Sequence, residues 1–191
     1  MDTTVRKEAQ LESQRLLLTR PVYLDTETTG TGPQAEIIEL AVVDDDGAVL
    51  YDSLVRPRGT IHPDAARVHG ITPAQLAGAP TWPDAWNEVA PLIAGRYIGA
   101  YNAEFDLRML QQSHQRSWLR WNDEEYGKFF CIMKLFARYQ GDWDRKRNAY
   151  RNHSLEIAGQ MCNITIPNSH RAADDARLAR ALLIHMAGWE R

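Results

Sequence analysis

The chain has 191 residues, of which 44% are hydrophobic and 25% are charged, and its formal net charge is −3 at pH 7. This length predicts one domain with a sizeable core, and the composition is typical of a soluble globular protein. The mildly acidic balance excludes a global basic signature for nucleic acid, but it leaves open a local basic groove or a metal-mediated phosphate contact. The two cysteines have no motif spacing, so we expect no disulfide framework and a reducing, cytosolic setting.

The N-terminal segment is charged and lacks the apolar centre of a signal peptide. No apolar run approaches the length of a membrane span, so we expect a cytoplasmic protein with no membrane contact. Residues 3–18 contain no Gly or Pro and favour a helix. We therefore predict a helical extension over residues 1–20, either packed on the main domain or contacting a partner. The leucines at 16–18 favour packing.

The first part of the main domain, from residue 21 onward, predicts strands. An apolar run over 21–24 begins the first strand, and a β-branched run over 37–43 forms the second. The acidic stretch 44–47 is a turn signal, and residues 48–55 form a third strand. Two hairpin-like connections in succession predict an antiparallel meander.

Residues 57–80 are rich in Pro, Gly and Thr, and we assign no regular element to them. Thr81 is then a plausible N-cap for a helix that ends before Gly95. Trp82 and Trp86 lie at helical spacing with later apolar residues, which favours a place in the core over a role as nucleic-acid stacking platforms.

The second half of the chain alternates between strands and helices. We expect strands over 97–101 and 129–133, a helix over 103–113 after an Asn102 cap, a polar surface loop over 141–151, and helices over 154–161 and 171–187. A meander followed by alternating helices and strands predicts an α/β fold with a mixed sheet.

Two carboxylates, Asp25 and Glu27, end the first predicted strand. Side chains two residues apart on a strand leave the same face of the sheet, and two like charges held together are unfavourable without a cation. Mg²⁺ and Mn²⁺ are natural partners for such a pair. Gly30, in the turn that follows, allows a close backbone approach. The alternative is an ordinary exposed strand end.

Two later carboxylates fall on the inner faces of predicted helices. At about 100° per residue, Asp106 lies on the same side as Phe105 and Met109. Either it stabilises the helix N-terminus or it holds a metal together with Asp25 and Glu27. In the last helix, Asp175 lies at the edge of the apolar face defined by Ala172, Ala176, Ala179, Leu183 and Met186, whereas Asp174 points to solvent.

His170 precedes the last helix, five residues before Asp175. On one helix that spacing would put the two side chains on different faces. They converge only if His170 lies in the preceding loop and reaches over the site. A loop histidine is commonly solvent-exposed, but its place beside an inward carboxylate favours a general base.

These residues form three ordered motifs that resemble the DEDDh 3′→5′ exonucleases, the group that includes the proofreading epsilon subunit of bacterial DNA polymerase III, RNase T and oligoribonuclease. The motifs span 25–30, 102–106 and 170–176, and residues 68–72 resemble a segment near the substrate's terminal nucleotide. The resemblance implies a ribonuclease H-like three-layer fold, with a mixed sheet of about five strands and helices on both faces. Residues 21–191 would then form the exonuclease domain.

The resemblance also implies a mechanism. Asp25, Glu27, Asp106 and Asp175 would hold two Mg²⁺ or Mn²⁺ ions, and His170 would accept the proton of the attacking water. The products would be nucleoside 5′-monophosphates from single-stranded or frayed 3′ ends of DNA or RNA. The residues expected to contact the terminal nucleotide are Gly30, His69, Ile71 and Asn102.

Two positions depart from the pattern: Tyr101 replaces a histidine found in many members, and residues 131–133 lack an expected Asp. Neither is a metal ligand or the base. The basic loop over 141–151 is either solvated or guides a single strand by phosphate contact. The alternatives for the whole chain are a non-catalytic nucleic-acid or polymerase-interaction module, and a phosphohydrolase acting on small nucleotides. The sequence leaves open DNA or RNA as substrate, and a polymerase or a second copy as partner.

Overall fold

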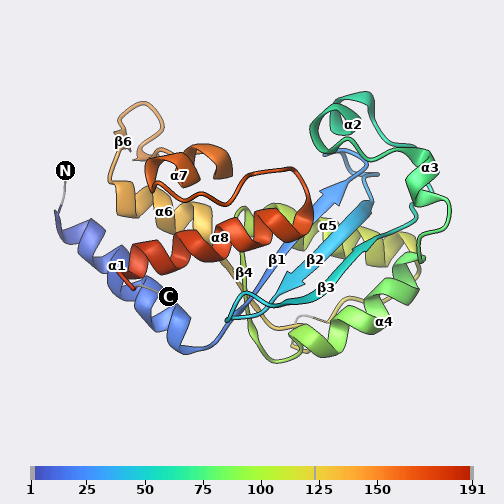
Figure 1. Ribbon diagram of the computed structural model, residues 1–191, viewed down its shortest axis with the longest axis horizontal. Coiled ribbons are helices and arrows are strands. Elements are labelled where there is room, and N and C mark those ends of the chain that lie inside the picture. Colours follow the sequence, from blue (N-terminus) through green and yellow to red (C-terminus); the bar gives the residue numbers. More distant parts are fainter. Residues whose placement is uncertain (1–2, 123, 190–191) are drawn as a thin grey trace.

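The computed structural model describes residues 3–122 and 124–189. Its centre is a sheet with the strand order β3-β2-β1-β4-β5 (Figure 1). The strands are β1 Val22–Thr28, β2 Ile37–Val43, β3 Val49–Leu54, β4 Tyr97–Ala100 and β5 Lys128–Cys131. The first three form the predicted antiparallel meander, and β4 and β5 run parallel to β1. The predicted mixed sheet is therefore confirmed.

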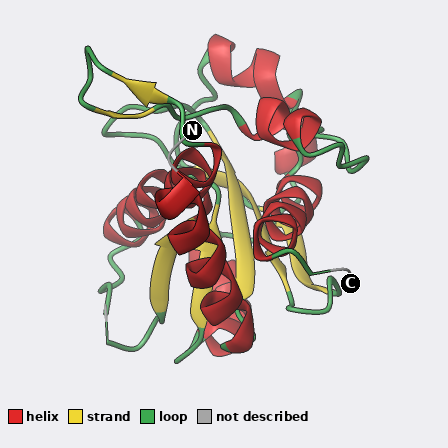
Figure 2. Ribbon diagram, turned by 90° about the vertical axis from the view of Figure 1, so that its left-hand side faces the viewer, coloured by secondary structure: helices red, strands yellow, loops and turns green. Residues whose placement is uncertain are grey.

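Helices cover both faces of this sheet (Figure 2). They are α1 Thr3–Leu18, α2 Pro63–His69, α3 Pro73–Leu76, α4 Trp82–Ile93, α5 Ala103–Arg116, α6 Ile132–Gln140, α7 Leu155–Met161 and α8 Ala172–Ala187. One apolar cluster joins α1, α6, α7 and α8 to the sheet, and a second joins α4 and α5 to it. The result is the three-layer arrangement that the resemblance implied.

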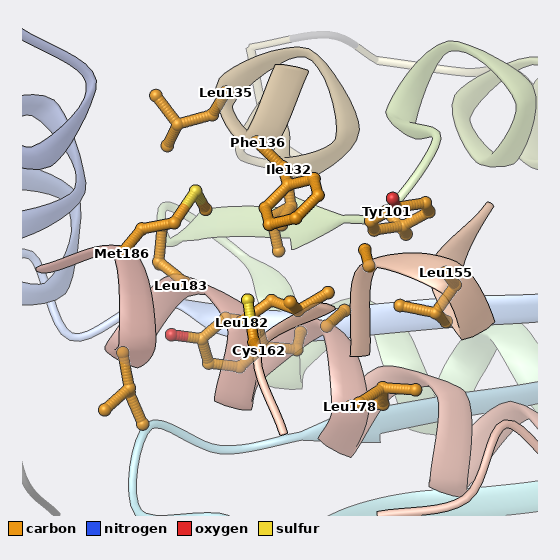
Figure 3. Packing of buried hydrophobic residues seen from close by; sticks show 14 of the residues in the cluster. Tyr101, Ile132, Leu135, Phe136, Leu155, Cys162, Leu178, Leu182, Leu183 and Met186 are labelled. Atoms are coloured by element: carbon orange, nitrogen blue, oxygen red, sulfur yellow. The ribbon is translucent and has the colours of Figure 1, made fainter. Parts of the chain in front are cut away.

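The first cluster surrounds α8, whose apolar face is buried as the helical spacing predicts (Figure 3). The helix α1 packs on α8 and α6, and Gln14 Nε2 donates to the carbonyl of Ala187 at 2.9 Å. Of the leucines at positions 16–18, Leu17 is buried but Leu18 is 72% exposed. The N-terminal helix is thus packed against the rest of the chain along one stripe.

The second cluster buries the two tryptophans of α4. Trp82 and Trp86 stack with ring centroids 5.5 Å apart, and His114 of α5 lies edge-on to both rings. All three side chains are buried. The interpretation of these tryptophans as core residues is confirmed.

The segment 57–80 contains two short helices that the sequence did not reveal. In α2, the ring of His62 caps the N-terminus, and Gly70 with φ 68° ends the helix in the left-handed region that favours glycine. In α3, Thr72 and Gln75 form a reciprocal capping box. Both helices are too short to show an apolar period, so only their caps could have signalled them.

Two further boundaries differ from the prediction. The strand expected over 129–133 ends at Cys131, and α6 starts at the next residue. The expected surface loop over 141–151 contains a hairpin, β6 Trp143–Asp144 paired with β7 Ala149–Tyr150. Its strands have only two residues each, so they carry no alternation of polar and apolar positions.

The two cysteines, Cys131 and Cys162, are free, as expected. Within residues 3–122 and 124–189, no helix has the length and apolar character needed to cross a membrane.

Candidate active site

Asp25 and Glu27 lie at the carboxyl-terminal end of the central strand β1. They alternate with buried neighbours and share the sheet face of Tyr23, which packs in the cluster around α8. Thr26 leaves the opposite face, toward α5. The strand therefore presents a pair of carboxylates to one layer and a hydroxyl to the other.

Asp106 enters the site from α5, in the first turn after β4. Its side chain is buried, and Thr26 Oγ1 donates to Asp106 Oδ1 at 2.8 Å. The partial positive charge of the helix N-terminus also favours a carboxylate at this position. The inward position deduced from helical geometry is confirmed, and Thr26 fixes the side chain.

Asp175 enters from the first turn of α8, on the other side of the sheet. It is buried, whereas Asp174 is partly exposed and accepts a hydrogen bond from Ser169 Oγ at 2.8 Å. Asn168 Nδ2 donates to Asp175 Oδ2 at 2.7 Å. Asp175 Oδ1 is buried and has no hydrogen-bond partner among the described residues. One oxygen of this carboxylate is thus held in place, and the other lacks a donor.

His170 lies in the loop immediately before α8, as convergence with Asp175 requires. One ligand atom each from Glu27, His170 and Asp175 lies within 4.8 Å of the others. The backbone φ of His170 is 52°, in the left-handed region that non-glycine residues seldom adopt. Such strained residues cluster at functional sites, where the surrounding structure holds them.

The site is strongly acidic. Burial, followed by the charges of Asp106, Asp175 and Glu27, raises the pKa of Asp25 well above its ordinary value. Burial is also the main cause that raises the pKa of Glu27 to about 8, with Asp175 next. The pKa of Asp106 is about 7, raised by burial against the lowering effect of the Thr26 hydrogen bond. Burial raises that of Asp175 to about 6, and the Asn168 hydrogen bond opposes it.

These residues fit a divalent cation. Buried carboxylates that raise one another's pKa are stabilised by a positive charge, and carboxylate oxygens are the ligands that hard cations prefer. Asp175 Oδ1 has no hydrogen-bond partner among the described residues and lies beside Glu27 and His170, so this oxygen can coordinate a cation. The donor set therefore matches the chemistry of a metal-dependent phosphodiesterase.

An ion pair that the sequence analysis missed, between the buried Glu39 and the half-exposed Arg171, anchors α8 to the sheet. Glu39 on β2 is 1% exposed and lies directly opposite Glu27. Arg171 donates from Nε and Nη2 to Glu39 Oε1 at 2.8 and 2.6 Å, and the amide of Ala172 donates to Oε2 at 3.1 Å. Because Arg171 follows His170 and is the N-cap residue of α8, this pair holds the chain in place between His170 and Asp175. The only sequence signal was one charge inside an apolar strand.

The four residues expected at the terminal nucleotide lie in different surroundings. Asn102 is exposed at the N-terminus of α5, and the carbonyl of Gly30 accepts a hydrogen bond from Thr28 Oγ1 at 2.7 Å. His69 is buried and its Nδ1 accepts from the amide of Ile71 at 2.9 Å, while burial lowers the pKa of its ring and a hydrogen bond with the backbone of Thr28 opposes that shift. Ile71 is only 3% exposed and packs with Ile38 and Leu76.

The departure at Tyr101 has a structural explanation. Its side chain is buried in the cluster around α8, and its hydroxyl donates to the carbonyl of His153 at 2.9 Å. Cys131 Sγ donates to the carbonyl of Tyr101 at 3.4 Å. Tyr101 therefore ties β4 to the segment before α7.

The fold and the site together define a class of protein. A mixed sheet flanked by helices, with an acidic cluster at the end of its first strand, is the arrangement of a ribonuclease H-like nuclease. Residues 22–183 match the model of the RNase T family, described as exonuclease. The chain belongs to this exonuclease family and is a 3′→5′ exonuclease, a hydrolase of phosphodiester bonds at nucleic-acid ends.

Relatives that are similar over most of this chain agree. The chain is 32% identical over 170 residues to the uncharacterized exonuclease CP81 of Escherichia phage 186, covering 87% of each sequence. It is 34% identical over 177 residues to exodeoxyribonuclease 10 of Escherichia coli K12, covering 87% of this chain and 69% of that one. A solved structure of exonuclease X with 5′-overhanging duplex DNA matches with a TM-score of 0.63 and 30% identity, covering 88% of this chain and 93% of that one.

Proposed function

We propose that this exonuclease removes nucleotides from single-stranded or frayed 3′ ends by hydrolysis that depends on two divalent cations. Asp25, Glu27, Asp106 and Asp175 hold the cations in this proposal, and His170 is the general base. The observation that carries it is the convergence of Glu27, His170 and Asp175 within 4.8 Å, next to a buried carboxylate oxygen without a donor. A module that had lost its activity would not need this strained, like-charged arrangement.

When bound, Mg²⁺ or Mn²⁺ would acidify a water and stabilise charge on the phosphoryl oxygens. The residues of the chain supply the rest. His170 takes a proton from the attacking water, whose oxygen forms a bond to the terminal phosphorus. The bond from phosphorus to the 3′-oxygen of the preceding nucleotide breaks, and that oxygen takes up a proton from solvent water. The products are a nucleoside 5′-monophosphate and a strand with a new 3′-hydroxyl. The Glu39–Arg171 pair keeps the imidazole in position for this proton transfer.

Binding of the terminal nucleotide is assigned to Gly30, His69, Ile71 and Asn102. Asn102 supports the assignment because it is exposed in the turn that leads to Asp106. His69 supports it through its place at the end of β1, where its ring forms a hydrogen bond with the backbone of Thr28. Ile71 contributes through the position it gives the His69 ring rather than through exposed surface.

DNA is the proposed substrate for two reasons. The name of exodeoxyribonuclease 10, which is 34% identical to this chain, specifies DNA. Exonuclease X, which is 30% identical, was solved in complex with DNA. The test is the rate of mononucleotide release from matched DNA and RNA strands in Mg²⁺. Faster degradation of DNA supports the proposal, and faster degradation of RNA contradicts it. A polymerase or a second copy of the chain as partner stays a prediction, which size-exclusion chromatography with and without polymerase would check.

Metal binding has an expected signature in protein stability. Without divalent cations, the free energy of unfolding should fall as the pH rises from about 4 to about 8. The folded-state pKa values of Glu27, Asp106 and Asp175 are about 8, 7 and 6, above the ordinary values of 4.5, 3.8 and 3.8. The folded state binds protons to these carboxyls more tightly than the unfolded state does. The stability that protonation contributes is therefore complete at a pH below the ordinary pKa values, and it is lost as the pH rises through each folded-state pKa.

Thermal unfolding at several pH values, with chelator or with Mg²⁺, measures this effect. Cation at about 100 times its Kd adds about 2.7 kcal/mol of stability, which is a rise in Tm of about 5–10 °C for a chain of this size. The rise should be largest near pH 8 and should disappear near pH 4, where the carboxyls are protonated. An increase in Tm that is independent of pH would contradict a carboxylate site.

A further inference from the structure

A groove lies beside α6 and opens onto the hairpin β6–β7. Its volume is about 490 Å³, and it is lined by Lys134, Ala137, Arg138, Ala149, Tyr150 and Asn152. The lining combines an aromatic ring, an amide and two cations, and each cation is paired with a carboxylate, Lys134 with Glu104 and Arg138 with Glu12. None of these residues belongs to the acidic cluster. We call this feature the α6 groove.

One end of the α6 groove lies close to the active site. The strands β4 and β5 run parallel to β1, so the helices that follow them begin at the same edge of the sheet as Asp25. Lys134, in the first turn of α6, forms an ion pair with Glu104 in the first turn of α5. Glu104 lies in the same first turn of α5 as Asp106, on the exposed face of the helix. The α6 groove therefore begins beside the helical turn that carries Asp106.

The other end of the groove is aromatic. Tyr150 lines the groove and meets Trp143 edge to face, with ring centroids 4.9 Å apart. Trp143 is 45% exposed, because the small hairpin has no apolar core of its own that could bury the ring. An exposed aromatic ring beside exposed cations is a feature on which single-stranded nucleic acids stack. Figure 1 places this hairpin at the end of the molecule opposite α2 and α3.

The turn of the hairpin carries Arg145, Lys146 and Arg147, all exposed. Among the described residues, Arg145 and Lys146 form no ion pair, and the Arg147–Asp144 pair is long at 3.9 Å. The turn does not need these cations, because Asp144 Oδ1 accepts from the amides of residues 146 and 147 at 2.9 and 3.2 Å.

We propose that the α6 groove and the hairpin bind the single strand that leads away from the reacting 3′ end. The phosphates lie along the groove toward Arg145 and Lys146, and a base stacks on Trp143. The inference rests on the proposed function for the polarity of the strand. It adds the path of the substrate beyond its last nucleotide, and it predicts that strand length controls affinity.

The experiment compares hydrolysis of a dinucleotide with hydrolysis of a strand of about 16 nucleotides, the upper site size of a single-strand-binding module. In Trp143→Ala, KM for the long strand should rise about tenfold through the loss of one stacked base. In the double variant Arg145→Ala/Lys146→Ala, the salt dependence should weaken by roughly 0.7 in the slope of log KM against log salt for each lost phosphate contact. KM for the dinucleotide and kcat for both substrates should not change.

The chain provides a matched control at the opposite edge of the sheet. Trp118, 87% exposed, and the exposed Arg120 follow the carboxyl-terminal end of α5, which runs away from the active-site edge. Trp118→Ala and Arg120→Ala should leave KM for both substrates unchanged. The Arg145/Lys146 variant keeps the test valid if Trp143→Ala disturbs the hairpin, because neither cation packs in the fold.

Fluorescence anisotropy of a labelled long strand, without divalent cation, separates this proposal from the proposed function. Weaker binding by the hairpin variants, with unchanged binding by the control variants, supports the groove even if wild-type protein hydrolyses nothing. Equal loss in hairpin and control variants, or an equal loss for the dinucleotide and the long strand, would overturn it. The proposal would also be overturned if the hairpin variants weakened binding of duplex DNA and left binding of the single strand unchanged.

Discussion

Asp25→Asn should lower kcat for strand degradation by about a thousandfold, which corresponds to roughly 4 kcal/mol of transition-state stabilisation from correctly held cations. Burial, and then the charges of the other three proposed ligands, raises the pKa of Asp25, so we expect it to lie at the centre of the proposed cage. Asparagine has nearly the same shape but no charge. The same substitution should raise the Tm of the metal-free protein, because it removes a buried like charge, and should abolish the increase caused by Mg²⁺.

The adjacent carboxylates of α8 provide the control for this result. Asp175→Asn should resemble Asp25→Asn, because Asp175 is buried with an unpartnered oxygen. Asp174→Asn should retain near-wild-type kcat, because Asp174 is partly exposed and the amide oxygen can still accept from Ser169. Equal losses in the two α8 variants would show that the effect comes from net charge rather than from metal coordination.

His170→Ala should lower kcat by about 10²- to 10⁴-fold, the usual contribution of a positioned general base. The four carboxylates remain, so the Mg²⁺-dependent rise in Tm should be retained. This separation between activity and metal binding distinguishes a base from a ligand, which matters because His170 lies within 4.8 Å of Glu27 and Asp175. The measurements are single-turnover rates and thermal unfolding with and without Mg²⁺.

His185→Ala is the matched control, because His185 is exposed near the other end of α8 and contacts only the ring of Tyr139 in the aromatic interactions described. It should keep near-wild-type kcat. If His170→Ala turns over like wild type, the proton must go to another group. If it loses the Mg²⁺ effect on Tm together with activity, His170 is better described as a ligand.

The inward carboxylates could be predicted from the sequence because regular secondary structure has a fixed period. Strand alternation put Asp25 and Glu27 on one face, and helical rotation separated Asp175 from Asp174. These local rules require no knowledge of the fold. His170 also followed from geometry, since only a loop position lets it meet a residue five places later. The structure shows that position.

The residues that hold the site in place could not be predicted in this way. Glu39 meets Glu27 only through the register of β1 and β2, and Arg171 meets Glu39 only after α8 packs on the sheet. Thr26 is bonded to a residue 80 positions away. Each pairing is a tertiary contact without local period, so the sequence showed the reacting groups more clearly than the residues that orient them.

Irregular segments were the least predictable parts of the fold. The helices α2 and α3 are made by caps such as His62 and the Thr72–Gln75 box rather than by an apolar stripe. The hairpin β6–β7 is held by the Asp144 turn and the Trp143–Tyr150 contact, which a polar composition conceals. These segments flank the acidic cluster or extend away from it, and the β6–β7 hairpin is where the path of the strand is proposed.

The most direct test of the central claim is the product pattern from a single strand labelled at its 5′ end, incubated with purified protein in Mg²⁺, in Mn²⁺ and in chelator. The account predicts a ladder of labelled strands that shortens one nucleotide at a time from the 3′ end, with release of 5′-monophosphates and no reaction in chelator. Folded protein that releases nothing from DNA or RNA with either metal would contradict it. So would immediate release of the labelled nucleotide, or turnover that persists in chelator.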